Sequence, residues 1–496
     1  MSDLILAIDQ GTSSTKTVLF DENARIIAKG DALSETLYPR PGFVEQDPEG
    51  IYENTLLSVR SCMDRAGEVI PDAKDRVAAI GISNQRESFV LWDEKGVPLC
   101  NAVIWQCKRA IPICERLKGS PIEDEIRTRT GLILDPYFSG AKLAWMMENH
   151  SGLKDAAGSG KSFFGTIDTW LLYKFTRGRS YLTDYTNASR TLLFNIHTLG
   201  WDQTLMKAFG ANGLRMPGVV SSSFDFGASN LEGIFPKPIP ICGMIGDSHA
   251  AAFGQGCFKP GQAKATLGTG SSILCNTGAS APVSDHGMVT TICWSTQERV
   301  DYALEGIIVS CGSTIKWLRD QLGLFSSSAE TETMVRGLDS SGGVYLIPAF
   351  SGMGAPHWKM DARASIVGLT FGTGRRHIVR AALESVIFQI KDVILAMEKD
   401  SGVKLSQLKV DGGMSANNWL LQMMADLLGV RVTTVGIQEV SALGAAYMAG
   451  LGIGIFQEIA ALSKLRGNGK YFDPSPASGS LLDSYETWQS MLEKHC

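Results

Sequence analysis

Two Gly-Thr-rich turns, each between two runs of β-favouring residues, constrain the fold of this chain more than any other feature. The first lies in ILAIDQGTSSTKTVLFD (residues 5–21) and the second in ATLGTGSSILCNTG (residues 265–278). Glycine lets the main chain approach a ligand closely, and successive backbone N–H groups at such a turn can converge on an anion. Either turn alone is also compatible with an ordinary hairpin. Their recurrence in the two halves of the chain predicts a duplicated fold in which both turns grip one polyphosphate.

An acidic residue accompanies only the first of these turns. Asp9 ends the strand that leads into it, whereas the strand that leads into the second turn ends near Leu267 and carries no acid. A metal-bound phosphate requires a carboxylate, or a water molecule held by one, among the ligands of the metal. We therefore expect a nucleotide site whose first turn carries the metal-facing acid.

Length and pattern indicate two α/β domains. A chain of 496 residues is too long for one core, and its 44% hydrophobic residues supply enough apolar material for two. Short β-branched runs alternate with longer helical patterns, which favours α/β layers. A boundary near residue 255 divides the chain into similar halves, so we expect domains at 1–254 and 255–496.

Charge and cysteine usage exclude several classes of function. The formal net charge is -5, without a run of Lys or Arg along a predicted face, so no nucleic acid is expected as a partner. The ten cysteines form no Cys-x-x-Cys pair and no His/Cys cluster with zinc spacing, which is typical of reduced cytosolic cysteines. The start MSDLILAIDQ has no basic leader, and no apolar run is long enough to span a bilayer. We expect a cytoplasmic protein without a membrane span.

A polar turn, SNQRES, places Arg86 and Glu87 side by side between two predicted strands. Adjacent opposite charges are common on solvated surfaces, so a plain charged turn is one interpretation. Trp105 and Tyr137 follow in the same half of the chain. An Arg and a Glu that hold hydroxyl groups, with aromatic walls for a carbon backbone, are typical of a small polyol pocket.

Asp247 is the candidate general base. The run IPICGMIGDSHAAAFGQG predicts a strand that ends at Gly246-Asp247 and an Ala-rich helix that follows. Phosphoryl transfer to an alcohol needs a carboxylate to accept the hydroxyl proton, and one on a rigid junction suffices. Because Asp also caps helices well, a purely structural role stays open here. Ser248 and His249 can either hydrogen-bond a substrate or simply begin the helix.

The second half contains a further segment that could bind a nucleotide. The run LKVDGGMSANNWLLQMMADLLG (408–429) predicts a strand, a Gly-Gly turn and a helix capped by Ser415 or Asn417. Such a junction suits a nucleotide base or ribose. The preceding run, residues 377–402, predicts a core helix that ends at a Gly402 C-cap.

These residues together resemble the FGGY family of carbohydrate kinases, within the superfamily of actin, hexokinase and Hsp70 (ASKHA). YFSGAKLAWMMEN (137–149) and SIVGLTFGTGRRHIVRAALE (365–384) are similar to the two family signatures, and the likeness runs almost from end to end. Runs such as SNQRES, GTIDTWLLYKFTRGR and SALGAAYMAGL are most similar to its glycerol kinase branch.

The resemblance implies a fold, a reaction and partners. The fold would be two actin-like (ribonuclease H-like) domains flanking a catalytic cleft, with the polyol held by the N-terminal domain and the nucleotide by the C-terminal one. The reaction would be ATP-dependent phosphorylation of a small polyol, glycerol to glycerol 3-phosphate or a close relative, with an Asp base and Mg²⁺. The family also implies a homo-oligomer, a dimer or a tetramer.

Roles carry over residue by residue. Asp9 and Asp247 would face the metal, and Asp247 would also act as the base. The residues that would contact the substrate are Arg86, Glu87, Trp105, Tyr137, Asp247, Ser248 and Ser272. The residues that would contact the nucleotide are Thr12, Ser13, Ser14, Lys16, Gly268, Thr269, Gly312, Lys316, Gly412, Gly413 and Asn417. Lys316 departs from the branch, which usually has Gln there.

The residues that differ from the glycerol kinase branch concentrate where the substrate is expected to bind. Ser248-His249 replace the usual Gln-Gln after the base, and Ser271-Ser272 replace Cys-Phe after the second turn. These changes suggest a roomier, more polar pocket, suited to a four- or five-carbon polyol or ketose such as erythritol, threitol, erythrulose or xylulose. NLEGIFPKPIPI also lacks the glycines and Arg of the loop that binds fructose 1,6-bisphosphate in regulated members, so we expect no inhibition by that sugar.

An alternative of another class is a non-catalytic ATP-binding scaffold, because this superfamily fold also serves chaperones and filaments. A scaffold has no need of a proton acceptor in its cleft. The presence of Asp9, Arg86, Glu87 and Asp247 therefore argues against it.

Overall fold

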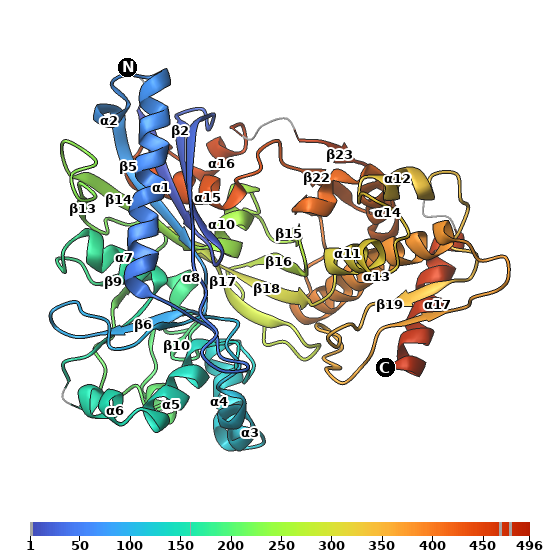
Figure 1. Ribbon diagram of the computed structural model, residues 1–496, viewed down its shortest axis with the longest axis horizontal. Helices are drawn as coiled ribbons and strands as arrows, with labels where there is room; N and C mark the ends of the chain where they lie inside the picture. Colours follow the sequence, from blue (N-terminus) through green and yellow to red (C-terminus); the bar gives the residue numbers. More distant parts are fainter. Residues whose placement is uncertain (1–2, 159, 466–468, 476–478) are drawn as a thin grey trace.

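Two large β-sheets, one in each half of the chain, organise the computed structural model, which describes residues 3–158, 160–465, 469–475 and 479–496. Figure 1 shows the N-terminal half (blue to green) beside the C-terminal half (yellow to red). Helices pack on both sheets, which confirms the expected α/β class.

The N-terminal sheet has the strand order β13-β14-β5-β1-β2-β3. β1 and β2, and then β2 and β3, pair antiparallel, whereas β5 runs parallel to both β1 and β14. The central strands are continuous apolar runs because helices cover the sheet. The strands are β1 (Leu4–Gln10), β2 (Ser14–Asp21), β3 (Ile26–Leu33), β5 (Val77–Asn84), β13 (Ala228–Ser229) and β14 (Ile239–Gly246).

The C-terminal sheet has the strand order β17-β18-β16-β15-β21-β22-β23. β15, β16, β18 and β17 form an antiparallel series, and β21 runs parallel to both β15 and β22. The strands are β15 (Gln262–Leu267), β16 (Ser271–Gly278), β17 (Val289–Ser295), β18 (Val300–Ile308), β21 (Gln407–Asp411), β22 (Arg431–Thr434) and β23 (Tyr471–Phe472).

The two sheets repeat one pattern of five strands. The series β3, β2, β1, β5, β14 corresponds in order and direction to the series β18, β16, β15, β21, β22. The two Gly-Thr turns join equivalent pairs of strands, β1 to β2 and β15 to β16. The predicted duplication is confirmed, and its two actin-like units match the expected fold class.

Smaller sheets and the helices complete the molecule. The smaller sheets contain β4 (Glu45–Gln46), β6 (Phe89–Trp92), β7 (Ala102–Val103) and β8 (Phe163–Thr166); β10 (Phe194–Asn195) and β11 (Gly200–Trp201); β9 (Leu182–Asp184) and β12 (Gly218–Val220); β19 (Tyr345–Ile347) and β20 (Ser365–Val367). The helices are α1 (Pro48–Val69), α2 (Ala73–Arg76), α3 (Ile111–Leu117), α4 (Pro121–Thr130), α5 (Ser139–Asn149), α6 (Ser151–Gly158), α7 (Ile167–Phe175), α8 (Tyr185–Ala188), α9 (Gln203–Ala208), α10 (Asp247–Gly254), α11 (Gly312–Asp320), α12 (Glu330–Val335), α13 (Arg375–Ser401), the 3-10 helix η1 (Gly413–Ala416), α14 (Asn418–Leu428), α15 (Val440–Gly452), α16 (Ile459–Leu462) and α17 (Gly479–His495).

A helix from the C-terminal half lies on the N-terminal sheet. α15 packs against β1, β5, β14 and α10, and Figure 1 shows it next to the N-terminal strands. Glycines permit this close approach: a Cβ on Gly444 would lie 1.9 Å from the carbonyl oxygen of Ala250, and one on Gly81 would lie 2.2 Å from that of Ala445. A helix from the second half of the chain thus belongs to the packing of the first half. The division into domains at 254/255 stays a prediction.

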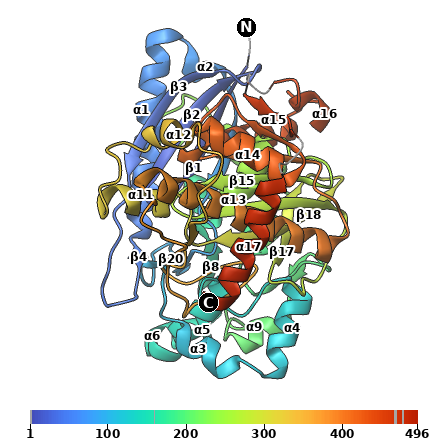
Figure 2. The ribbon, with the colours of Figure 1, turned by 90° about the vertical axis from the view of Figure 1, so that its right-hand side faces the viewer.

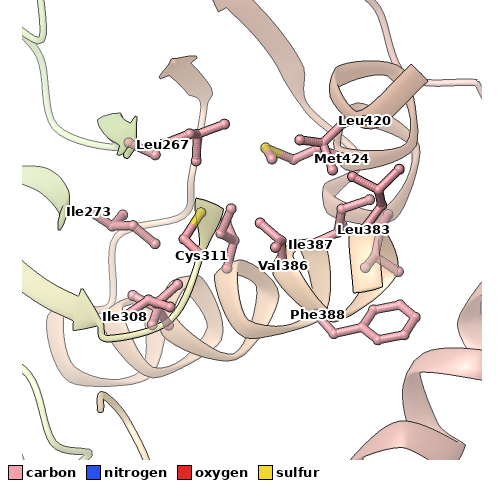
Figure 3. Packing of buried hydrophobic residues seen from close by; sticks show 14 of the residues in the cluster. Leu267, Ile273, Ile308, Cys311, Leu383, Val386, Ile387, Phe388, Leu420 and Met424 are labelled. Carbon is pink, nitrogen blue, oxygen red and sulfur yellow. The ribbon is translucent and has the colours of Figure 1, made fainter. Parts of the chain in front are cut away.

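The C-terminal core fixes the second Gly-Thr turn. α13 ends at Gly402, whose φ of 67° forms the predicted left-handed C-cap. Figure 3 shows Leu383 and Val386 of this helix in the same packed cluster as Leu267 and Ile273 of the β15–β16 hairpin. α17 packs along α13, as Figure 2 shows. Because Leu267 directly precedes the turn, this packing holds the turn in place.

We expect Gly444→Ala to destabilise the protein, because the new methyl group would collide with the backbone of α10. Overpacking of this kind costs roughly 1–3 kcal/mol of unfolding free energy, measured by urea denaturation. Gly67→Ala is the matched control: Gly67 lies in α1 with open space around the position of a Cβ, so the substitution should leave stability unchanged or raise it by up to about 1 kcal/mol. Equal effects of the two substitutions would contradict the close α10–α15 packing.

Candidate functional site

The first Gly-Thr turn joins β1 to β2 and presents Thr12 and Ser13 at its tip. The backbone N–H of Gly11 donates to the carbonyl oxygen of Ser14 at 3.0 Å, which closes the turn. Ser13 is exposed, and Thr12 and Ser14 are partly exposed. The predicted phosphate-binding residues of this turn therefore lie together and are accessible.

Asp9 lies at the end of β1, beside this turn. Ser83 donates a hydrogen bond to its Oδ1 at 2.9 Å. Burial raises the pKa of Asp9 to about 6; the Ser83 hydrogen bond opposes this shift, and the nearby charge of Asp247 adds to it. Two neighbouring carboxylates beside the predicted phosphate-binding turn fit the oxygen ligands that Mg²⁺ prefers. No cluster of three or more His, Cys, Asp or Glu with metal-ligand geometry occurs within the described residues.

The second turn lies against two other glycine-containing segments. Gly312 donates a backbone hydrogen bond to the carbonyl oxygen of Gly268 at 2.9 Å, and Ser313 donates one to that of Thr269 at 3.1 Å. A Cβ on Gly312 would lie 2.6 Å from the Gly268 oxygen, and a Cβ on Gly412 would lie 2.6 Å from the Leu267 oxygen. The structure thus brings together three of the predicted nucleotide segments.

The remaining predicted nucleotide residues lie around these segments. Gly413 begins η1, and Asn417 caps α14 by accepting a hydrogen bond from the Leu420 N–H at 2.9 Å, so Asn417, not Ser415, is the cap. Lys316 is exposed one turn further along α11. Lys16 lies opposite Asp9 in the β1–β2 register, but its ammonium lies 3.2 Å from the Glu439 carboxylate.

Arg86 and Glu87 are buried, with 7% and 2% of their surfaces exposed, so the solvated-turn interpretation is wrong. Arg86 donates from both terminal nitrogens to Glu305, at 3.1 and 3.3 Å. Arg190 donates to Glu87 at 2.6 Å, and its Nη2 lies 2.8 Å from Glu305. Burial alone would raise the pKa of Glu305, but the two arginines outweigh it and hold that pKa well below the usual range.

The two predicted aromatic walls are in contact. The rings of Trp105 and Tyr137 are 5.7 Å apart in an edge-to-face arrangement. Buried Lys142 donates to the carbonyl oxygen of Tyr137, and the Trp105 indole N–H donates to the hydroxyl of Thr12 at 2.8 Å. The aromatic pair is therefore hydrogen-bonded to the first Gly-Thr turn.

Asp247 is the first residue of α10, after Gly246, which occupies the cap position. Its Oδ1 accepts from Arg86 Nε at 3.0 Å and from the Ser248 N–H at 2.6 Å, while 40% of its side chain stays exposed. An oriented but accessible carboxylate suits proton acceptance better than a fully used capping group does.

Ser248 and Ser272, predicted to shape the pocket, face each other with their hydroxyl oxygens 3.0 Å apart. Buried Lys264 donates to Ser248 at 2.6 Å and to Ser272 at 3.4 Å, and Ser272 donates to Glu305 at 3.0 Å. Burial lowers the pKa of Lys264. The two serine hydroxyls and the Lys264 side chain therefore form one hydrogen-bonded group.

Sequence reasoning missed Glu305, Arg190 and Lys264. Each is the only charged residue in a short uncharged stretch: ALEGII, NASRTLL and AKATL. All three are buried. Since an unpaired charge is costly to bury, a lone charge in such a run is the signal that could have found them.

All ten cysteines are free. Within the described part of the chain, no helix has both the length and the apolar character needed to cross a bilayer.

Family models match both halves of the chain. Residues 4–254 match the N-terminal domain of the FGGY family of carbohydrate kinases, and residues 263–453 match its C-terminal domain.

Individual proteins resemble the chain over its whole length. A glycerol kinase of Thermoanaerobacter sp. is 44% identical over 100% of this chain and 99% of its own, and one of Carboxydothermus hydrogenoformans is 46% identical over 99% and 97%. The crystal structure of Plasmodium falciparum glycerol kinase with ADP has a TM-score of 0.93 at 35% identity, covering 100% of this chain and 98% of its own. A gluconate kinase of Lactobacillus acidophilus, 21% identical with a TM-score of 0.87 and coverage of 100% and 97%, shares the fold.

We expect Asp9→Asn to stabilise the metal-free, nucleotide-free protein at pH 7. The pKa of Asp9 is higher in the folded protein than its ordinary value of 3.8, so the proton contributes stability at low pH that is lost as the pH rises through about 6. Removing the charge should raise the unfolding free energy by about 1–3 kcal/mol at pH 7 and by nothing below pH 3.8. Urea denaturation at several pH values measures this difference, with Asp72→Asn as the surface control; a pH-independent difference would contradict it.

Proposed function

The chain belongs to the FGGY family of carbohydrate kinases and is a phosphotransferase, and from this premise we propose that it transfers the γ-phosphate of ATP to glycerol or a closely related small polyol. The observation that carries the proposal is the position of Asp247. Its carboxylate interacts with Asp9 beside the first turn, and the adjacent Ser248 hydrogen-bonds to Lys264 and Ser272 of the second hairpin. The start of α10 therefore joins the strands that carry both phosphate turns.

In the proposed reaction, each part has a separate task. Arg86 orients Asp247, which accepts the proton of the attacking hydroxyl as the oxygen–phosphorus bond forms. Backbone N–H groups of the two turns stabilise the negative charge on the transferring phosphoryl group. Trp105 and Tyr137 hold the carbon chain, and Arg86 and Glu87 bind its hydroxyl groups. Domain closure excludes water and limits wasteful hydrolysis of ATP.

Mg²⁺, the compartment and the assembly complete the proposal. Asp9 and Asp247 would hold Mg²⁺, directly or through water, and the ion would neutralise phosphate charge. The ten free cysteines support a reducing, cytoplasmic location. We also propose a homo-oligomer, a dimer or a tetramer, from the family resemblance alone.

A second candidate substrate is a four- or five-carbon polyol or ketose. The Ser248–Ser272 pair and the Lys264 ammonium favour it, because they can hydrogen-bond the additional hydroxyl groups of a longer substrate. An apolar side chain at the same place would offer no such bonds. A third candidate, a non-catalytic ATP-binding scaffold, gives no reason for a half-exposed, oriented carboxylate at Asp247.

Replacing Asp247 by Asn tests the base. The variant keeps the size of the side chain but cannot accept the hydroxyl proton, so kcat should fall by about 10²-fold or more while the Kd for ADP stays within about threefold. Steady-state kinetics and calorimetric titration measure the two effects. Asp72→Asn, at a surface site, should leave both unchanged. An Asp247→Asn enzyme that keeps most of its activity would disprove the assignment.

A substrate panel tests the pocket. The longer-substrate candidate predicts that kcat/KM for erythritol, threitol, erythrulose or xylulose equals or exceeds that for glycerol. Ser272→Phe should lower the values for the longer substrates by at least about tenfold relative to glycerol, because a bulky ring replaces the small side chain that contacts Ser248. A strong preference of the unmodified enzyme for glycerol would defeat the longer-substrate candidate and leave the glycerol kinase proposal standing.

A further inference from the structure

A closed circuit of hydrogen bonds connects the aromatic wall to the first phosphate turn. At the side-chain level, the Trp105 indole N–H donates to the Thr12 hydroxyl at 2.8 Å. A second path joins the backbone N–H of Trp105 to the backbone carbonyl oxygen of Thr12 through three side chains. The Trp105 N–H donates to Ser88 at 3.2 Å, and Gln46 donates to the carbonyl oxygen of Thr12 at 2.7 Å.

Gln85 closes the circuit between these two bridges. Its side-chain Oε1 accepts from the Ser88 hydroxyl at 2.9 Å, and its side-chain Nε2 donates to Oε1 of Gln46 at 2.9 Å. Each amide thus uses its oxygen on one side and its nitrogen on the other, so the donors run in one direction from Trp105 to Thr12.

The bridging side chains are buried. Gln46 and Gln85 are 1% exposed, and Ser88 is fully buried. A buried amide that loses a partner keeps its desolvation cost, so the circuit resists partial opening. Gln85 is also fixed to β1, because its backbone N–H and its amide both donate to Gln10, at 2.8 and 3.2 Å. The circuit is therefore anchored to the strand that ends in the phosphate turn.

We propose that Gln46, Gln85 and Ser88 are positioning residues that couple polyol binding to nucleotide binding. This rests on the proposed function, in which Trp105 contacts the polyol and Thr12 contacts the outer phosphates. A polyol that orders Trp105 also orders Thr12 through both paths, so less ordering cost remains when the nucleotide binds. Linkage is reciprocal, so the nucleotide improves polyol affinity by the same factor.

The test measures the Kd for ADP by calorimetry, with and without saturating glycerol. In the unmodified protein, glycerol should tighten ADP binding about fivefold or more. Gln46→Glu keeps the side-chain size but removes the donor to Thr12, and Ser88→Ala removes the bridge from Trp105 to Gln85. In both variants, glycerol should tighten ADP binding by less than about twofold.

Ser58→Ala is the matched control for Ser88→Ala. Ser58 is also fully buried in the N-terminal half, but among the described residues its hydroxyl bonds to Thr17 of β2 and Thr55 of α1, away from the circuit. The Ser58→Ala variant should therefore keep the full glycerol-dependent tightening of ADP binding. No linkage in the unmodified protein, full linkage in both circuit variants, or equal loss in Ser58→Ala would each overturn the proposal. Failure to phosphorylate any polyol would defeat the proposed function instead, since linkage is measured without turnover.

Discussion

The buried charges around Glu305 are the interaction on which the rest of the site depends. Arg86, Glu87 and Arg190 come from the N-terminal half, whereas Glu305 comes from β18 of the C-terminal sheet. The charges of two arginines and two glutamates cancel, which lowers the free-energy cost of burying them. Removing one partner from such a group typically costs about 3–5 kcal/mol, because a buried charge is left unpaired. The same group that joins the halves therefore also orients Asp247 through Arg86.

This constraint explains why the site is both rigid and accessible. Glu305 occupies both terminal nitrogens of Arg86, so the guanidinium has a fixed plane, and its Nε points at Asp247. Ser272 also donates to Glu305. One carboxylate on the C-terminal sheet thus orients both the candidate base, through Arg86, and the Ser272 hydroxyl. The half-exposed Asp247 is left facing solvent, where a substrate hydroxyl could reach it.

Local patterns in the sequence were sufficient to predict the hairpins, the α13 C-cap and the strand-to-helix junction at Asp247. The Gly-Thr repeat also predicted the duplication, because a recurring turn reports a recurring pair of strands. Long-range partners were not predictable in the same way. Nothing local to Arg86 identifies Glu305 as its partner 219 positions away, and nothing local to β1 identifies α15 as the helix that covers it. The nucleotide, metal and substrate roles of the individual residues stay predictions.

The central claim is that the two halves assemble around one phosphoryl transfer from ATP to a polyol hydroxyl. The most direct measurement is a ³¹P NMR spectrum of the purified protein incubated with ATP, Mg²⁺ and the polyol panel. The account predicts a new phosphomonoester resonance that grows in step with ADP. Formation of ADP with inorganic phosphate alone, or no loss of ATP with any polyol, would contradict it.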